Sequence, residues 1–222
     1  DAAAARAALA GSGLVVALTQ YRDALVDNAD VLLPIAAFTE TAGTYVNAEG
    51  LVQSVQGVVP PKGDARPAWK VLRVLGNLLG LEGFAHETAD QVRAEALGDV
   101  AALASRLNNR TSVSIAPGAP SQGLERIADV PIYATDAVVR HASSLQLTAD
   151  AAAPRVAISS AQWVQLGLKA GDSVRVTQGQ ASAVLPARED STLAAQAVRV
   201  PAGRIETAAL GSMFGALTIE KA

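Results

Sequence analysis

The chain has 222 residues, half of them hydrophobic, with a formal net charge of −3 and an isoelectric point near 5.4. This composition excludes general disorder, and the scattered Lys and Arg residues give no electrostatic footprint for nucleic acid. There is no cysteine, and the histidines are His86 and His141. Because iron–sulfur clusters need thiolate ligands, we expect no such cluster and no other metal site in this chain.

The N-terminal part predicts the tail of a doubly wound α/β domain. Residues 2–10 favour a helix that ends at Gly11. Leu14 to Leu18 and Val31 to Leu33 are apolar runs typical of strands buried on both faces of a parallel sheet. The chain begins without Met and enters this pattern midway, so we expect it to be a fragment. No apolar run approaches the roughly 20 residues of a membrane span.

The most specific stretch is Thr39 to Gly63, TETAGTYVNAEGLVQSVQGVVPPKG. Its glycine-flanked Thr-Tyr-Val-Asn run offers polar atoms at Thr44, Asn47 and Glu49, and glycines allow a ligand to approach the backbone. The segment is therefore a candidate binding loop. The alternative is a structural strand and turn, in which Asn47 and Glu49 bond to neighbouring backbone.

Helices follow this segment. A buried stripe of Trp69, Leu72, Leu75 and Leu79 predicts one helix, which ends at Gly80. Thr88 and Gln91 form a capping-box pair for another helix, interrupted at Gly98-Asp99. Proline, glycine and serine then predict a linker at residues 111–125. Residues 129–140 return to a strand-like composition.

From Pro154 onward the pattern predicts a small barrel. Arg155 to Ile158 favours a strand, Ser159 caps a short helix, and Gly171-Asp172 forms a tight turn. Strands are expected at residues 173–177, 181–187 and 196–200. Strand, one-turn helix, turn, strand, glycine turn and strand is the local order of a double-psi β-barrel.

The chain resembles the molybdopterin oxidoreductase superfamily, and most closely the large iron–sulfur subunit of bacterial respiratory NADH–quinone oxidoreductase (complex I), in two stretches that follow the expected order. They are the Thr39 to Gly63 segment and the barrel pattern from Pro154 onward. The resemblance implies an α/β fold: the tail of a doubly wound α/β domain with helices at residues 1–110, then a double-psi β-barrel-like domain at residues 126–222. In relatives that carry the cofactor, the Thr39 to Gly63 region lies near the pterin. His141, beside Arg140, falls where relatives place residues close to the dinucleotide.

Arg140 and His141 are therefore further candidates for a vestigial pocket, because an imidazole beside a guanidinium can bind pyrophosphate. The alternative is an exposed or satisfied histidine on a connecting segment. We assign no catalytic, cofactor-binding or metal-binding residue beyond the pocket candidates Thr44, Asn47, Glu49, Arg140 and His141.

The resemblance implies a scaffold portion of complex I, which transfers electrons from NADH to quinone through iron–sulfur clusters held in the missing N-terminal part of the subunit. The parent complex is then an enzyme, whereas this fragment is not expected to be catalytic by itself. Its partners would be the rest of its own subunit and other peripheral-arm subunits, on the cytoplasmic side of the bacterial inner membrane.

Two alternatives come from other classes of protein. The first is the C-terminal part of a molybdenum or tungsten bis-molybdopterin-dinucleotide oxidoreductase of the formate dehydrogenase type, whose metal ligand would lie upstream. The second is an autonomous substrate-binding module. The sequence of this chain alone leaves both open.

Overall fold

The computed structural model describes residues 2–22, 26–107, 110, 112–114, 116 and 123–222. Backbone contacts divide the chain into two units. The α/β unit is Gly13–Ile115, and the barrel unit is Ala116–Ala222 together with Asp1–Ser12. The predicted linker at 111–125 lies largely outside the described residues, and the domain bounds proposed from the sequence stay predictions.

Two short parallel strands begin the α/β unit. Strands β1 (Val16–Thr19) and β2 (Val31–Pro34) pair with Val16 opposite Val31, and the 3-10 turn η1 (Val26–Asn28) lies between them in the chain. The parallel pairing was predicted. Burial on both faces was wrong, because Leu14 and Val16 are exposed and only Ala17 of β1 is buried. In the described part of the unit these two strands form a sheet of their own, so no further strand completes it.

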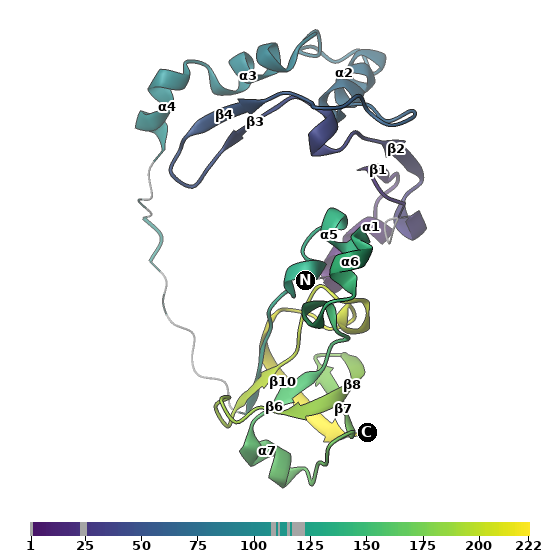
Figure 1. Ribbon diagram of the computed structural model, residues 1–222, viewed down its shortest axis with the longest axis vertical. Helices are drawn as coiled ribbons and strands as arrows, with labels where there is room; N and C mark the ends of the chain where they lie inside the picture. The colour runs from purple at the N-terminus through teal and green to yellow at the C-terminus, as the bar shows by residue number, and fades with distance from the viewer. Residues whose placement is uncertain (1, 23–25, 108–109, 111, 115, 117–122) are drawn as a thin grey trace. The chain divides into compact units, whose positions relative to one another are not determined.

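The rest of the described part of this unit is a short 3-10 turn, a hairpin and three α-helices. After η2 (Phe38–Glu40), strands β3 (Gly43–Val46) and β4 (Val52–Val55) form the antiparallel ribbon seen in Figure 1. Helices α2 (Ala68–Leu78), α3 (Ala89–Leu97) and α4 (Val100–Arg106) follow. The predicted capping box is confirmed, because the Gln91 N–H donates to Thr88 Oγ1 at 3.2 Å. The predicted interruption is a full break, since Gly98 has a φ of 64° and Asp99 caps α4.

The sequence predicted that the apolar stripe of α2 is buried, and this is wrong for two of its four residues. Leu72 and Leu79 are exposed, whereas the buried residue of the helix is Gly76. The ring of Phe84 lies directly against Gly76, so closely that an added Cβ would be 2.3 Å from Phe84 Cγ. The apolar stripe is present, as periodicity indicated, but the described chain covers only part of it.

In its described residues, the barrel unit contains helix α1 (Ala2–Ala10) and six strands. These are β5 (Leu124–Ile127), β6 (Val156–Ile158), β7 (Ser173–Gln178), β8 (Ala181–Glu189), β9 (Ala197–Arg199) and β10 (Phe214–Lys221). They close into a barrel in the order β10-β5-β9-β6-β8-β7, with β5–β9 and β6–β8 parallel. Figure 1 shows β6, β7, β8 and β10 gathered around one core, with α7 (Ser160–Gln165) at one end. The predicted barrel is confirmed, although β5 and β10 were not foreseen.

Aliphatic side chains fill the barrel. The core cluster comprises Val156, Ile158, Leu168, Val174, Val176, Leu185, Ala187, Val198, Val200, Leu210 and Leu217. Alternation along the strands points the strand members of this cluster inward, as on any barrel wall, whereas Leu168, Val200 and Leu210 lie outside the strands. The low aromatic content of the sequence therefore produces a core of interlocking Val, Leu and Ile side chains.

Short helices, rather than the expected strand, connect β5 to β6. They are η3 (Ile132–Ala134), α5 (Ala137–His141), α6 (Ser143–Gln146) and η4 (Ala149–Ala151). Asp136 decides the structure here, because its Oδ1 accepts the Val139 N–H at 3.0 Å and caps α5. The strand-like composition of residues 129–140 was thus overridden by local capping. A further turn, η5 (Ile205–Thr207), follows β9.

Arg126 crosses the interior of the barrel unit with 1% of its surface exposed. Its Nε and Nη2 donate to the Val200 carbonyl at 3.3 Å, and Nη2 also donates to Pro201 O at 3.3 Å. Its Nη1 donates to Gln178 Oε1 and to Ser212 O, each at 3.0 Å. Burial lowers the pKa of Arg126 from its ordinary value. One guanidinium therefore joins four separate segments of the barrel through neutral acceptors.

Asp172 closes the turn before β7 and makes barrel stability depend on pH. Its Oδ2 accepts from Lys221 Nζ at 2.7 Å and from the Lys169 N–H at 2.8 Å, and these bonds lower its pKa below 3.8. Because the unfolded chain then binds the proton more tightly, the stabilisation is present above the ordinary pKa and is lost as pH falls through the folded-state pKa.

We expect Asp172→Asn to lower the melting temperature at neutral pH, and the difference from wild type to shrink below about pH 4. Thermal melts of both proteins across this range measure the effect. A difference of equal size at neutral and acidic pH would contradict the role assigned to the ionised carboxylate.

Candidate functional site

The Thr39 to Gly63 segment forms the β3–β4 hairpin and one wall of a pocket. At the tip of the hairpin, Asn47 Oδ1 accepts the N–H groups of Glu49 at 3.0 Å and Leu51 at 2.9 Å. Thr44 Oγ1 lies 3.0 Å from Ser54 Oγ across the ribbon, and Arg93 of α3 donates to the same Ser54 oxygen at 2.9 Å. These bonds shape the turn and fasten the ribbon to α3.

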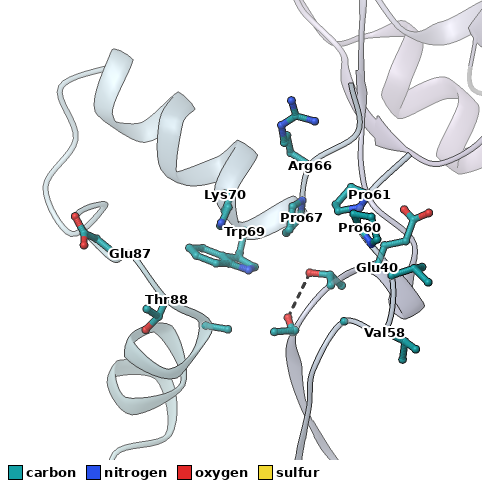
Figure 2. Close-up of a pocket in the computed structure, with 15 residues that line it drawn as sticks. Glu40, Val58, Pro60, Pro61, Arg66, Pro67, Trp69, Lys70, Glu87 and Thr88 are labelled. Atoms are coloured by element: carbon teal, nitrogen blue, oxygen red, sulfur yellow. Dashed lines mark hydrogen bonds between the residues drawn. The ribbon is translucent and has the colours of Figure 1, made fainter. Parts of the chain in front are cut away.

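The larger pocket of the α/β unit, which we call the Trp69 pocket, measures about 680 Å³. Figure 2 shows Trp69 at its centre, with Thr88 on one side and Pro60 and Pro61 on the other. Its lining comes from the loop after η2, the loop after β4, the start of α2 and the start of α3: Glu40, Thr41, Ala42, Gly57, Val58, Val59, Pro60, Pro61, Arg66, Pro67, Trp69, Lys70, Glu87, Thr88 and Ala89.

A smaller hollow of about 220 Å³ lies between β3 and α3 and shares Ala42, Trp69 and Ala89 with the Trp69 pocket. Thr44 and Val46 line it from the ribbon, and Val92 and Leu97 line it from α3. The two hollows are therefore adjacent. Of the predicted candidates, Thr44 lines the smaller hollow, and Asn47 and Glu49 lie at the hairpin turn.

The charged groups at the Trp69 pocket are largely engaged with their own surroundings. Arg66 Nη1 donates to Gly63 O at 3.1 Å and Ala65 O at 2.7 Å, and Lys70 Nζ lies 5.4 Å from the centre of the Trp69 ring. Glu40 Oε2 accepts the Ala37 N–H at 3.2 Å. The chemistry of this lining, apolar rings and prolines with balanced charge, suits contact with polypeptide.

Arg140 and His141 lie in the last turn of α5 in the barrel unit. There the positive charge of Arg140 interacts favourably with the negative end of the helix dipole. Arg140 Nη1 donates to Ala134 O at 3.3 Å, and His141 Nδ1 lies 2.8 Å from Ala137 O, so this ring nitrogen is the donor. These contacts are with backbone of their own unit. The role of all five candidate residues in ligand binding stays a prediction.

Sequence reasoning missed two arginine features. Arg126 shares the inward face of β5 with Leu124, two residues earlier, and the alternation of LERI was the available signal. Arg155, Arg188 and Arg199 line a pocket on the barrel unit, and their sequence spacing gave no sign of this. Among the described residues, no cluster of His, Cys, Asp and Glu suits a metal ion.

The barrel unit and the α/β unit together are similar in fold to a solved structure. Over 88% of this chain and 34% of the other, the fold matches acetylene hydratase from Pelobacter acetylenicus with a TM-score of 0.59 and 18% identity. Residues 1–78 match the family model described as Molybdopterin oxidoreductase. The predicted fold class and the predicted resemblance to this superfamily are therefore confirmed.

Curated relatives narrow the comparison to one subunit. The chain is 30% identical over 139 residues to the mitochondrial "NADH dehydrogenase [ubiquinone] iron-sulfur protein 1" of Solanum tuberosum, covering 60% of this chain and 19% of that protein. It is 51% identical over 51 residues, 23% of this chain, to the mitochondrial "NADH-ubiquinone oxidoreductase 78 kDa subunit" of Candida albicans, of which the match covers 7%. The chain thus spans less than a fifth of these relatives. They confirm the predicted resemblance to the large iron–sulfur subunit of complex I.

Proposed function

We propose that this chain is a scaffold portion of the large peripheral-arm subunit of respiratory complex I. In this role it packs against the cluster-bearing part of its own subunit and against neighbouring subunits, and electrons pass through iron–sulfur clusters held elsewhere. The names of the curated relatives support this over the molybdenum or tungsten alternative. With no cysteine among its 222 residues, the chain does not fit an iron–sulfur cluster.

The exposed apolar surface of the α/β unit is the observation that carries the proposal. In the described part of this unit, the buried hydrophobic residues are Ala17, Ala36 and Leu103. Large apolar side chains are instead exposed from its first strand to its helices, among them Leu14, Phe38, Tyr45, Val58, Leu78 and Leu79. Apolar surface on this scale marks an interface with other polypeptide.

The location follows as part of the same proposal: a peripheral arm on the cytoplasmic side of the bacterial inner membrane. Within the described ranges, no helix has the length and hydropathy of a transmembrane segment. Attachment through protein contacts, by way of the apolar faces of the α/β unit, is the arrangement that we propose.

Metal analysis of the purified full-length protein tests the proposal. We expect iron in stoichiometric amounts and neither molybdenum nor tungsten, because the clusters lie in the remainder of the subunit and the cofactor of the related enzymes is absent. Mass spectrometry of the metals after size-exclusion chromatography is the measurement, with the chromatography buffer as the blank. Stoichiometric molybdenum or tungsten would overturn the scaffold role and favour the formate dehydrogenase type.

A further inference from the structure

A pocket of about 460 Å³ opens on the outer face of the barrel unit, where β8, β6 and β9 lie side by side. Ala157 of β6 pairs with Arg188 of β8 and with Arg199 of β9. Paired positions in neighbouring strands project to the same face, so the two arginines flank Ala157. Arg155 lies two residues before Ala157 and shares this face.

We call this the arginine pocket, because Arg155, Arg188 and Arg199 line it, and its floor is closed. Ala157 is 1% exposed although it is absent from the core cluster, which contains its neighbours Val156 and Ile158. The outer surface of the sheet is therefore covered at this point, and the long stems of the flanking arginines lie where they can cover it. Arg188 and Arg199 are thus held on barrel strands, and Arg155 directly precedes β6.

One carboxylate is ion-paired with one of these guanidinium groups. Arg188 Nη2 lies 3.5 Å from Asp190 Oδ2, and the side chain of Asp190 is 13% exposed. Asp190 Oδ1 accepts from Thr192 Oγ1 and N–H, and these bonds lower its pKa first, with a further contribution from the charges of Arg188 and Arg199. The ion pair with Asp190 holds Arg188 beside the pocket.

Counted together, four arginines and three aspartates lie at or beside the pocket: Arg155, Arg188, Arg199 and Arg204, and Asp129, Asp150 and Asp190. Asp129 and Asp150 also line it, but both are exposed, and neither appears in the ion pairs of the described residues. Arg204 adds positive charge behind the wall: its Nη2 donates to Ala151 O at 2.9 Å and to Ala152 O at 3.2 Å, and its buried Nε has no hydrogen-bond partner. The guanidinium groups here thus outnumber the carboxylates.

We propose that the arginine pocket binds a small oxyanion, a ligand bearing phosphate or carboxylate groups, between Arg155, Arg188 and Arg199. Guanidinium groups bind both kinds of group through paired, charge-assisted hydrogen bonds. The pocket volume lies in the range of about 300–1,000 Å³ that is usual for small-ligand sites. This inference does not depend on the scaffold role. That role is argued from the exposed apolar surface of the α/β unit, whereas the arginine pocket lies in the barrel unit.

Titration of the isotope-labelled 222-residue chain with inorganic pyrophosphate, and separately with citrate, tests the site. The readout is the Nε–H resonances of the arginines by nuclear magnetic resonance, at ionic strength held constant with sodium chloride. We expect saturable shifts of Arg155, Arg188 and Arg199 with a dissociation constant below about 1 mM. Tighter binding of pyrophosphate would assign a phosphate ligand, and tighter binding of citrate a polycarboxylate.

Variants make the test decisive. Arg188→Gln with Arg199→Gln should weaken binding at least about tenfold. Arg175→Gln is the matched control, because Arg175 is an exposed arginine on β7 of the same barrel, ion-paired with Glu220, and it should bind as wild type does. Arg155→Gln alone replaces the double variant if the latter fails to fold. Shifts that do not saturate, or equal binding by the double variant and wild type, would overturn the proposal.

Discussion

Replacing Arg126 by methionine is expected to lower the free energy of unfolding of the barrel by about 3 kcal/mol. The guanidinium donates to the carbonyls of Val200, Pro201 and Ser212 and to the side chain of Gln178. Methionine fills much of the same volume but donates nothing, so these acceptors, of which the Val200 carbonyl belongs to a buried residue, would lose their partner at a cost of about 1–3 kcal/mol for each buried one left unsatisfied. Removal of a buried charge offsets part of this loss.

Urea denaturation measures the effect through Trp163, which packs against the barrel core. Replacing Trp69 by phenylalanine removes the other tryptophan signal, from the α/β unit. Arg175→Met is the control: its exposed ion pair with Glu220 should contribute less than about 1 kcal/mol. If the Arg126→Met protein is as stable as the Arg175→Met control, the hydrogen bonds of Arg126 contribute no net stability.

A triple variant in which serine replaces Leu72, Leu78 and Leu79 is expected to reduce assembly of the parent complex more than tenfold. These side chains of α2 and of its C-cap residue Leu79 are 47%, 81% and 65% exposed in the described chain. If they are buried against partner polypeptide, as we propose, each contributes about 1.5–3 kcal/mol of apolar burial to the interface. Native gel electrophoresis, comparing assembled complex with total subunit, is the measurement.

The same triple variant should leave the isolated chain nearly unchanged, within about 0.5 kcal/mol for each substitution, because the side chains are already exposed there. Asn77→Ser, an exposed polar change on the same helix, is the control for expression and handling. Normal assembly of the triple variant would remove α2 from the interface. A large loss of stability in the isolated chain would show that these leucines serve its own fold.

Local patterns predicted much of this fold because they act over a few residues. The capping box of Thr88 and Gln91 and the glycine break at Gly98 work through neighbouring backbone, and both are found as expected. The β6 to β8 order of the barrel was likewise readable from strand, short helix and glycine turn. Where local signals competed, at residues 129–140, the Asp136 cap favoured helix over a strand-like composition.

The candidate site was only partly foreseen. Asn47 was identified as a turn residue or a ligand contact, and its two backbone hydrogen bonds show the first of these roles. The Trp69 pocket forms where separate segments between Glu40 and Ala89 meet at one aromatic ring. Hydrophobic periodicity does not indicate such contacts between distant segments. The arginine pocket depends in the same way on the register between β6, β8 and β9.

By itself, the sequence predicted the resemblance to the superfamily, the order of elements from β6 to β8 and the absence of thiolate ligands, because these reside in residue identity and short-range pattern. Only the tertiary structure decided which faces are covered. The stripe of α2 reads as a buried helix, yet Leu72, Leu78 and Leu79 remain exposed and Gly76 is buried beneath Phe84. Periodicity shows that a face is apolar, whereas burial depends on what packs against it.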